Sequence, residues 1–216
     1  MFELQGVKFK HIIDLPSLKI QENKITTLVG ESGGGKTTIL KLLNKMISPT
    51  EGKILFQGKP LDEIDSVTHR RQVSMLSQTP IVFEGNIKDN LLIGLKFQDK
   101  ELPNDNYLKE ILQKLQLNKN LNDNVELLSG GEKQRLSLGR IILLDSPVYL
   151  LDEPSSALDD STEDIIIQMV TGFVKENNKT LIMVTHSKEI ANKYSDTIIK
   201  INKGKHRMEG DIWMES

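Results

Sequence analysis

The chain has 216 residues and a formal net charge of -2, and 38% of its residues are hydrophobic, which is enough for a substantial core. Its 28 lysines and arginines are scattered, which argues against a nucleic-acid surface, and the absence of cysteine excludes disulfides and thiolate metal sites. The first fifteen residues mix charged with apolar side chains and no run of 18 apolar residues occurs, so we expect no signal peptide, no membrane span and a cytoplasmic location.

The N-terminal quarter carries short apolar stretches that differ from those of the rest of the chain. They predict an antiparallel β layer beside a second sheet. The apolar residues concerned are Phe2, Leu4, Val7 and Phe9, then Leu18 and Ile20, and later Ile54 and Phe56.

Four runs rich in Val, Ile and Leu, at 25–29, 148–151, 180–184 and 197–201, predict buried strands. Segments with helical spacing lie between them, so the sequence predicts an α/β fold with a mainly parallel sheet. One apolar stripe comprises Ile39, Leu40, Leu42, Leu43, Met46 and Ile47, and a second comprises Ile165, Ile166, Met169, Val170 and Phe173.

Residues 79–137 are mostly helical in pattern and contain polar loops, which indicates an inserted helical subdomain. We therefore expect a single domain over 1–216, with a core formed by 1–78 and 138–216 that includes the antiparallel layer. The chain has no internal repeat, so we expect only one copy of this domain in it.

A glycine-rich motif follows the first predicted strand directly and leads into the first helical stripe. It matches GxxxxGK[ST], the phosphate-binding loop, whose backbone N–H groups surround phosphates at a helix N-terminus. Lys36 would reach the β and γ oxygens of ATP, and the Thr37 hydroxyl would ligate Mg²⁺. A glycine-rich turn that only caps a helix would leave this lysine unexplained. The motif comprises Gly30, Glu31, Ser32, Gly33, Gly34, Gly35, Lys36, Thr37 and Thr38.

Two carboxylates, Asp152 and Glu153, follow the predicted buried strand at 148–151. Acids in this position are costly without a cation, so Asp152 is a candidate Mg²⁺ ligand. Glu153 could then polarise the water that attacks the γ-phosphate. The alternative interpretation is a polar strand end before the turn at Pro154.

The segment Leu128-Ser129-Gly130-Gly131-Glu132 permits two interpretations. Ser129 and Glu132 fit the SxxE capping box at a helix start. The paired glycines are not explained by capping, but a serine and two bare amides at a helix N-terminus form a second anion site. Two phosphate sites in one chain suggest a nucleotide sandwiched between two copies.

Together, the motifs at 30–37, 128–132 and 148–153 resemble those of ABC-transporter nucleotide-binding domains, and the match covers the whole chain. The resemblance implies a P-loop ATPase and gives roles to three further residues. Gln78 would be the Q-loop glutamine, a ligand of Mg²⁺ near the membrane partner. Asp159 would belong to the D-loop at 156–159, and His186 would be the switch histidine that contacts the γ-phosphate.

The turn after Phe9 departs from the family pattern, because His11 stands where a tyrosine usually stacks on adenine. Histidine can also stack, although over a smaller area and with a titratable charge. We expect His11 to contact the base and Phe9 to belong to the core.

The resemblance also predicts partners. Two copies, most simply a homodimer, would bind ATP and Mg²⁺ between them. A separate integral membrane permease would dock near Gln78 and the helical subdomain and hold the chain at the inner face of the membrane. The stretch from Gln78 to Asn90 is similar to QxxxxFxxxIxxN of exporter-type ATPases, and the style of subunit resembles bacterial iron or metal export ATP-binding proteins.

Two other function classes compete with transport. A soluble ABC-type ATPase acting on DNA or ribosomes would use the same nucleotide chemistry. Such proteins usually add a second half, coiled coils or zinc modules, which the single half, lack of sustained heptads and lack of cysteine disfavour. A small P-loop kinase would have no use for residues 128–132. We therefore expect no nucleic-acid partner.

Overall fold

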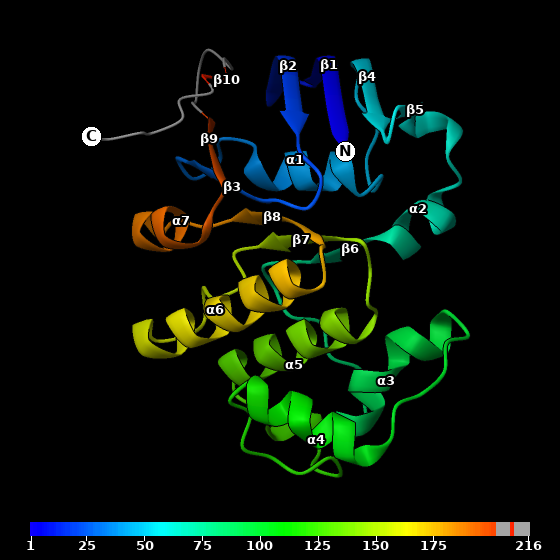
Figure 1. Cartoon of the computed structure of the whole chain (residues 1–216), viewed down its shortest axis with the longest axis vertical. Coiled ribbons are helices and arrows are strands. Elements are labelled where there is room, and N and C mark those ends of the chain that lie inside the picture. The colour runs from blue at the N-terminus through cyan, green and yellow to red at the C-terminus, as the bar shows by residue number, and fades with distance from the viewer. Residues whose placement is uncertain (202–207, 210–216) are drawn as a thin grey trace.

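The computed structural model describes residues 1–201 and 208–209, without the side chains of Asp160, Met208 and Glu209. The remaining residues at the end of the predicted 138–216 core lie outside the described part. Figure 1 shows three tiers, with an antiparallel sheet above, a second sheet in the middle and a group of helices below.

The upper tier is a four-stranded antiparallel sheet with strand order β2-β1-β4-β5. Its strands span Phe2–Phe9 (β1), Ile13–Ile20 (β2), Glu51–Phe56 (β4) and Lys59–Pro60 (β5). The register between β1 and β4 shifts between Gln5 and Lys8, where Gly6 has a φ of 59°. This bulge allows Leu4 and Val7 to be buried together although they are three residues apart. The predicted antiparallel layer is confirmed.

The middle tier is a six-stranded sheet with order β10-β9-β3-β8-β7-β6. Five strands are parallel, and β10 pairs antiparallel with β9 at one edge. The four predicted strands are confirmed as β3, β7, β8 and β9, whereas β6 and β10 were not predicted. The strands span Ile25–Gly30 (β3), Val73–Leu76 (β6), Val148–Asp152 (β7), Thr180–Val184 (β8), Thr197–Ile201 (β9) and Met208–Glu209 (β10).

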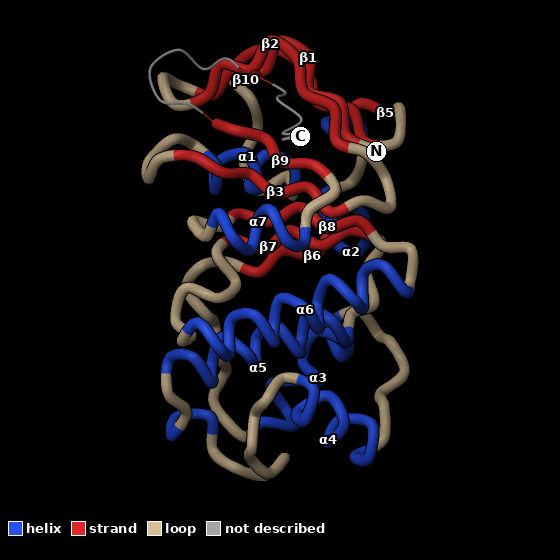
Figure 2. The backbone as a smooth tube through the Cα atoms, turned by 60° about the vertical axis from the view of Figure 1, so that its left-hand side comes forward, coloured by secondary structure: helices blue, strands red, loops and turns tan. Residues whose placement is uncertain are grey.

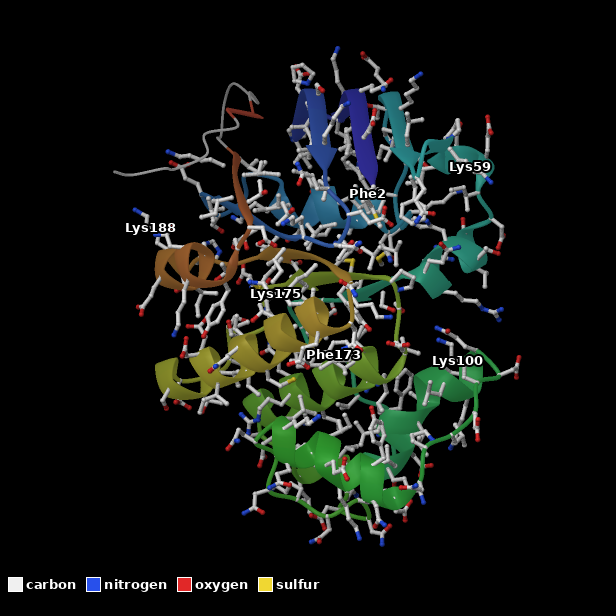
Figure 3. The ribbon with its side chains drawn as sticks, viewed as in Figure 1. Phe2, Lys59, Lys100, Phe173, Lys175 and Lys188 are labelled. Carbon is white, nitrogen blue, oxygen red and sulfur yellow. The ribbon has the colours of Figure 1, made fainter. Side chains whose placement is uncertain are left out.

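The parallel sheet divides the apolar interior into two cores because successive side chains of a strand point to opposite faces. In β7, Val148 and Leu150 join a core shared with α1 and the antiparallel sheet. Tyr149 and Leu151 join a core shared with the lower helices. Phe173 projects from α6 toward this lower core, where its ring lies 6.0 Å from that of Tyr149, and Phe2 lies on the other side of the sheet (Figure 3).

The helices cover both faces of the parallel sheet, with α1 between the two sheets and α5 and α6 below (Figure 2). Most begin at a residue that favours N-caps, such as Asn86 before α3, whose side chain accepts a bond from the Asp89 amide at 2.8 Å. The α-helices span Lys36–Leu43 (α1), Ser66–Gln72 (α2), Ile87–Phe97 (α3), Asp105–Lys114 (α4), Gly130–Leu143 (α5), Asp160–Glu176 (α6) and Lys188–Tyr194 (α7); 3-10 turns span Leu61–Glu63 (η1) and Val125–Leu127 (η2).

Two details of the predicted helical stripes are wrong. Helix α1 ends at Leu43, so Met46 and Ile47 follow it, and the Met46 side chain is 57% exposed. In α6, Ile165 is 45% exposed, and Ile167 is buried in its place. A three-residue isoleucine run presents only some of its members to one face of a helix, so composition alone does not identify them.

The region 79–137 contains α3, α4, η2 and the first half of α5, and α5 continues past residue 137. The division of the chain at 79 and 137 stays a prediction. Within the part of the chain that the structure describes, no helix is both long and apolar enough to span a membrane.

Candidate nucleotide-binding site

The phosphate loop joins β3 to α1, and Gly30, Gly33 and Gly35 in it have positive φ. Gly35 is the N-cap of α1 with a φ of 96°, and a Cβ there would lie 2.5 Å from Ile13 Cδ1. The loop therefore needs glycine at this position both for its conformation and for its close packing. Glu31 and Ser32 are exposed at its tip, and Thr38 is half-buried within the first turn of the helix.

Lys36 begins α1 and folds back over the loop. Its Nζ donates to the carbonyl oxygens of Gly30 and Glu31, both at 2.9 Å. The side chain is 5% exposed, and burial lowers the pKa of Lys36, which Glu153 and Asp152 partly oppose. A buried ammonium group held by neutral carbonyls is available to bind an anionic oxygen.

Thr37, in the first turn of α1, contacts Asp152, the last residue of β7. Thr37 Oγ1 donates to Asp152 Oδ1 at 3.0 Å. Asp152 is buried, and this burial raises its pKa, with Glu153 acting in the same direction and the Thr37 bond against it. A cation near the pair would offset the cost of burying this carboxylate.

Glu153 follows Asp152 and is held at both carboxylate oxygens. Gln78 Nε2 donates to Oε2 at 2.7 Å, and His186 Nε2 lies 2.8 Å from Oε1, so the imidazole carries its proton on that nitrogen. The three side chains come from the ends of β6, β7 and β8, which meet at the carboxyl edge of the parallel sheet. The structure thus brings Gln78, Glu153 and His186 together.

Ser129 is the N-cap of α5 and takes part in a capping box. Its Oγ accepts from the Glu132 amide at 3.3 Å, and Glu132 Oε2 accepts from the Ser129 amide at 2.8 Å. The predicted capping box is therefore confirmed. Ser129 and Gly130 are exposed and make no hydrogen bond to the phosphate loop within the described residues. The structure does not bring these two predicted phosphate sites together within one chain.

Asp159 is the N-cap of α6, and its carboxylate accepts from the Thr162 amide at 3.0 Å and the Ser161 hydroxyl at 2.5 Å. These bonds hold the pKa of Asp159 well below its usual range. The preceding residues contact the start of α5, since a Cβ on Gly131 would lie 2.9 Å from the Ala157 carbonyl oxygen. The exposed carboxylate of Asp159 has a structural role, and a nucleotide contact stays a prediction.

His11 is exposed in the turn between β1 and β2, next to the phosphate loop. The neighbouring residue Ile12 places its carbonyl oxygen 3.4 Å from the position that a Cβ on Gly35 would occupy. This neighbourhood is compatible with a base contact by His11. Phe9 is partly buried against the upper core, in agreement with the expectation that it belongs there.

Comparison with known proteins decides the family. The sequence model of the family described as ABC transporter matches residues 13–156, more than half of the chain. The chain belongs to the ABC transporter family. It is an ATP-binding, ATP-hydrolysing subunit that energises transport through a separate membrane subunit.

Relatives of this ABC subunit include both exporters and importers. It is 37% identical over 186 residues to the probable iron export ATP-binding protein FetA of Escherichia coli, covering 86% of this chain and 81% of that protein. It is 35% identical over 214 residues to the phosphate import ATP-binding protein PstB 3 of Natronomonas pharaonis, covering 92% and 75%.

A solved structure confirms the ABC fold. An ATP-bound bacterial Atm1-family ABC exporter has a TM-score of 0.85 at 25% identity, and the match covers 96% of this chain and 38% of that one.

An open groove of about 510 Å³ lies at the free edge of the parallel sheet in this ABC subunit. Met46 and Ile81, exposed by 57% and 60%, line it together with Arg70, Ser77 and Leu144. An apolar groove with one cation at its rim suits a partner segment with apolar and acidic side chains.

A buried polar cluster holds the segment beside this groove. Asn90 is fully buried, and its side chain bonds both the amide and the carbonyl of Phe83 at 2.8 Å. Arg140 on α5 donates to the carbonyl oxygens of Asn90 and Ile81 at 2.9 and 3.0 Å, and its guanidinium lies 5.0 Å from the centre of the Phe83 ring. Asn90 belongs to the predicted exporter-like stretch, whereas Arg140 was not predicted, because a cation in a helix that already carries Lys133 and Arg135 gives no distinct signal.

Proposed function

We propose that two copies of this subunit bind two ATP molecules head to tail. Lys36 and its loop would hold each nucleotide from one copy, and Ser129 and Gly131 would hold it from the other. The proposal rests on the exposed N-terminus of α5, where capping accounts for the serine and the nearby Ala157 carbonyl accounts for Gly131, but neither accounts for Gly130. Because that end makes no hydrogen bond to its own phosphate loop among the described residues, a second copy is the natural source of the missing half.

The role proposed for Glu153 is to accept a proton from the attacking water. Its two oxygens are fixed by Gln78 and His186, so the carboxylate is oriented before the nucleotide binds. Lys36 would exchange its two carbonyl acceptors for phosphate oxygens, and His186 would stabilise charge on the γ-phosphate. Loss of that phosphate removes contacts between the copies and opens the dimer.

The residues present fit a Mg²⁺ ion. The Thr37 hydroxyl, the Asp152 carboxylate and the Gln78 amide oxygen are the hard oxygen donors that Mg²⁺ prefers, and the buried Asp152 carries charge that a cation would offset. When bound, the ion would neutralise negative charge on the phosphates.

The groove at the sheet edge is the proposed docking place of the permease, which would hold the subunit at the inner face of the membrane. The groove is lined by Ile81, three residues from Gln78. A partner bound there would therefore act on the segment whose Gln78 side chain donates a hydrogen bond to Glu153. The exporter-like stretch from Gln78 to Asn90 and the similarity to an iron export relative favour export of a metal ion over phosphate import.

The test is affinity purification of tagged Glu153→Gln protein from detergent-solubilised membranes of its source, with ATP and Mg²⁺ present. We expect an ATP-dependent dimer together with a multi-span membrane protein. A Lys36→Met variant, which lacks the phosphate contact but keeps the groove, serves as the control and should not form the ATP-dependent dimer. Recovery of ribosomes or DNA-bound proteins would instead support the soluble ATPase class, and normal turnover by Glu153→Gln would refute the role of Glu153.

A further inference from the structure

Gln134 is a buried amide that neither the sequence motifs nor the proposed mechanism uses. It lies on α5, one turn after the helix start at Gly130, and is 1% exposed. Its Nε2 donates to the backbone carbonyl oxygen of Glu153 at 2.9 Å. Its Oε1 has no hydrogen-bond partner among the described residues.

Packing alone does not account for this amide. A buried polar atom without a partner is unfavourable, and an apolar side chain of similar length would fill the same space without that cost. The bond from Gln134 to Glu153 is therefore the feature that the glutamine provides and a methionine would not.

The backbone of Glu153 needs support. Its φ of 49° lies in the left-handed region, which is unfavourable for a residue with a Cβ and persists only where neighbours enforce it. The Glu153 amide donates to Val184 O at 3.0 Å, and its carbonyl accepts from the Ser156 amide at 3.2 Å as well as from Gln134. Of these contacts, only that of Gln134 comes from α5.

We propose that Gln134 is a positioning residue for Glu153, and this inference rests on the role proposed above for that carboxylate. By fixing the carbonyl of Glu153, it keeps the carboxylate between Gln78 and His186. The same bond joins Glu153, which serves the nucleotide on its own phosphate loop, to the helix whose start serves the nucleotide of the other copy. Gln134 thereby connects the two ATP sites of the dimer.

The experiment compares Gln134→Met with the wild-type chain in steady-state ATP hydrolysis. Because one buried hydrogen bond is lost and the nucleotide contacts remain, kcat should fall about tenfold while KM for ATP stays within about twofold. Gln113→Met on the exposed face of α4 is the matched control and should change neither constant.

A double-mutant cycle with Glu153→Gln makes the test specific. If Gln134 acts only through Glu153, adding Gln134→Met should not lower the residual rate of Glu153→Gln further. An equal fold-loss in both backgrounds, a change confined to KM, or a wild-type kcat would overturn the positioning role.

These experiments distinguish failure of the inference about Gln134 from failure of the proposed role of Glu153. If Gln134→Met does not fold, Gln134→Leu removes the same donor with a shorter apolar side chain, and the same loss of kcat is expected. Normal turnover by Glu153→Gln alone would refute the proposed function. An inactive Glu153→Gln beside a fully active Gln134→Met would refute only the inference about Gln134.

Discussion

Ser129 is both the N-cap of α5 and a proposed phosphate contact, and two substitutions separate these roles. Ser129→Ala removes the side-chain acceptor for the Glu132 amide. Ser129→Asp keeps an acceptor at the cap, and its charge is favourable at a helix N-terminus. However, it places a carboxylate where the phosphate of the other copy's nucleotide would approach.

The structure sets the expected stability changes. The bond lost in Ser129→Ala is long, at 3.3 Å, while the return bond from the Ser129 amide to Glu132 Oε2 at 2.8 Å remains. The free energy of unfolding should therefore fall by about 0.5–1 kcal/mol, near the lower end for lost caps. Ser129→Asp should stay within about 0.5 kcal/mol of wild type.

The effect on assembly should be in the opposite order. Two like charges about 4 Å apart repel by roughly 4 kcal/mol at an effective dielectric constant near 20, which corresponds to about a thousandfold weaker association. Ser129→Asp should therefore abolish ATP-dependent dimerisation in the Glu153→Gln background, and Ser129→Ala should only weaken it.

Urea unfolding followed by circular dichroism measures stability, and sedimentation with ATP measures the dimer. Asn104→Asp, at the N-cap of α4, is the control for adding a charge to a cap and should not affect dimerisation. A Ser129→Asp protein that still dimerises with ATP would show that Ser129 has only a capping role.

Three further predictions concern stability. Arg140→Met should lower the free energy of unfolding by about 3 kcal/mol, because the carbonyls of Ile81 and Asn90 lose their charged donor. Arg140→Lys should recover only part of this loss, as measured by urea unfolding. Burial lowers the pKa of His69, so as the pH falls the imidazole takes up a proton in the unfolded chain before it does so in the folded chain. The free energy of unfolding should therefore fall as the pH drops below about 6.5, by up to about 1.4 kcal/mol per pH unit. His69→Gln should flatten this slope, and an unchanged slope would contradict the role given to His69. Gly35→Ala should cost about 1–3 kcal/mol and weaken ATP binding in a titration, because of its φ of 96° and the contact with Ile13, and a wild-type melting temperature would refute this.

The fold could be predicted largely from strand patterns, and the predictions that failed did so for local reasons. The run at 180–184 has four apolar residues after Thr180 and is buried throughout, so its prediction matches β8. Strand β6 was missed because it has only four residues, of which Ser74 is polar, and its position depends on pairing with β7. A strand this short is defined by its neighbour more than by its own sequence.

The candidate site could be predicted only in part. The SxxE spacing predicted the capping box at Ser129 because both partners lie within one helical turn. The two side chains that contact the Glu153 carboxylate are distant in sequence: Gln78 is 75 positions away and His186 is 33 positions away. Only the order of the family motifs predicted that these residues lie near one another. Gln134 carries no signal in the sequence for its bond, which depends on how α5 packs below the parallel sheet (Figure 1).

The two separate cores have a consequence for local unfolding. The helices below the parallel sheet share one core, and the phosphate loop helix and antiparallel layer share the other. Amide hydrogens of α3 and α4 can therefore exchange with solvent through openings that leave the protection of α1 intact. The sheet lies between the two cores, so a membrane partner that loosens the lower helices would leave α1 and its phosphate loop in place while changing the contacts made by α5.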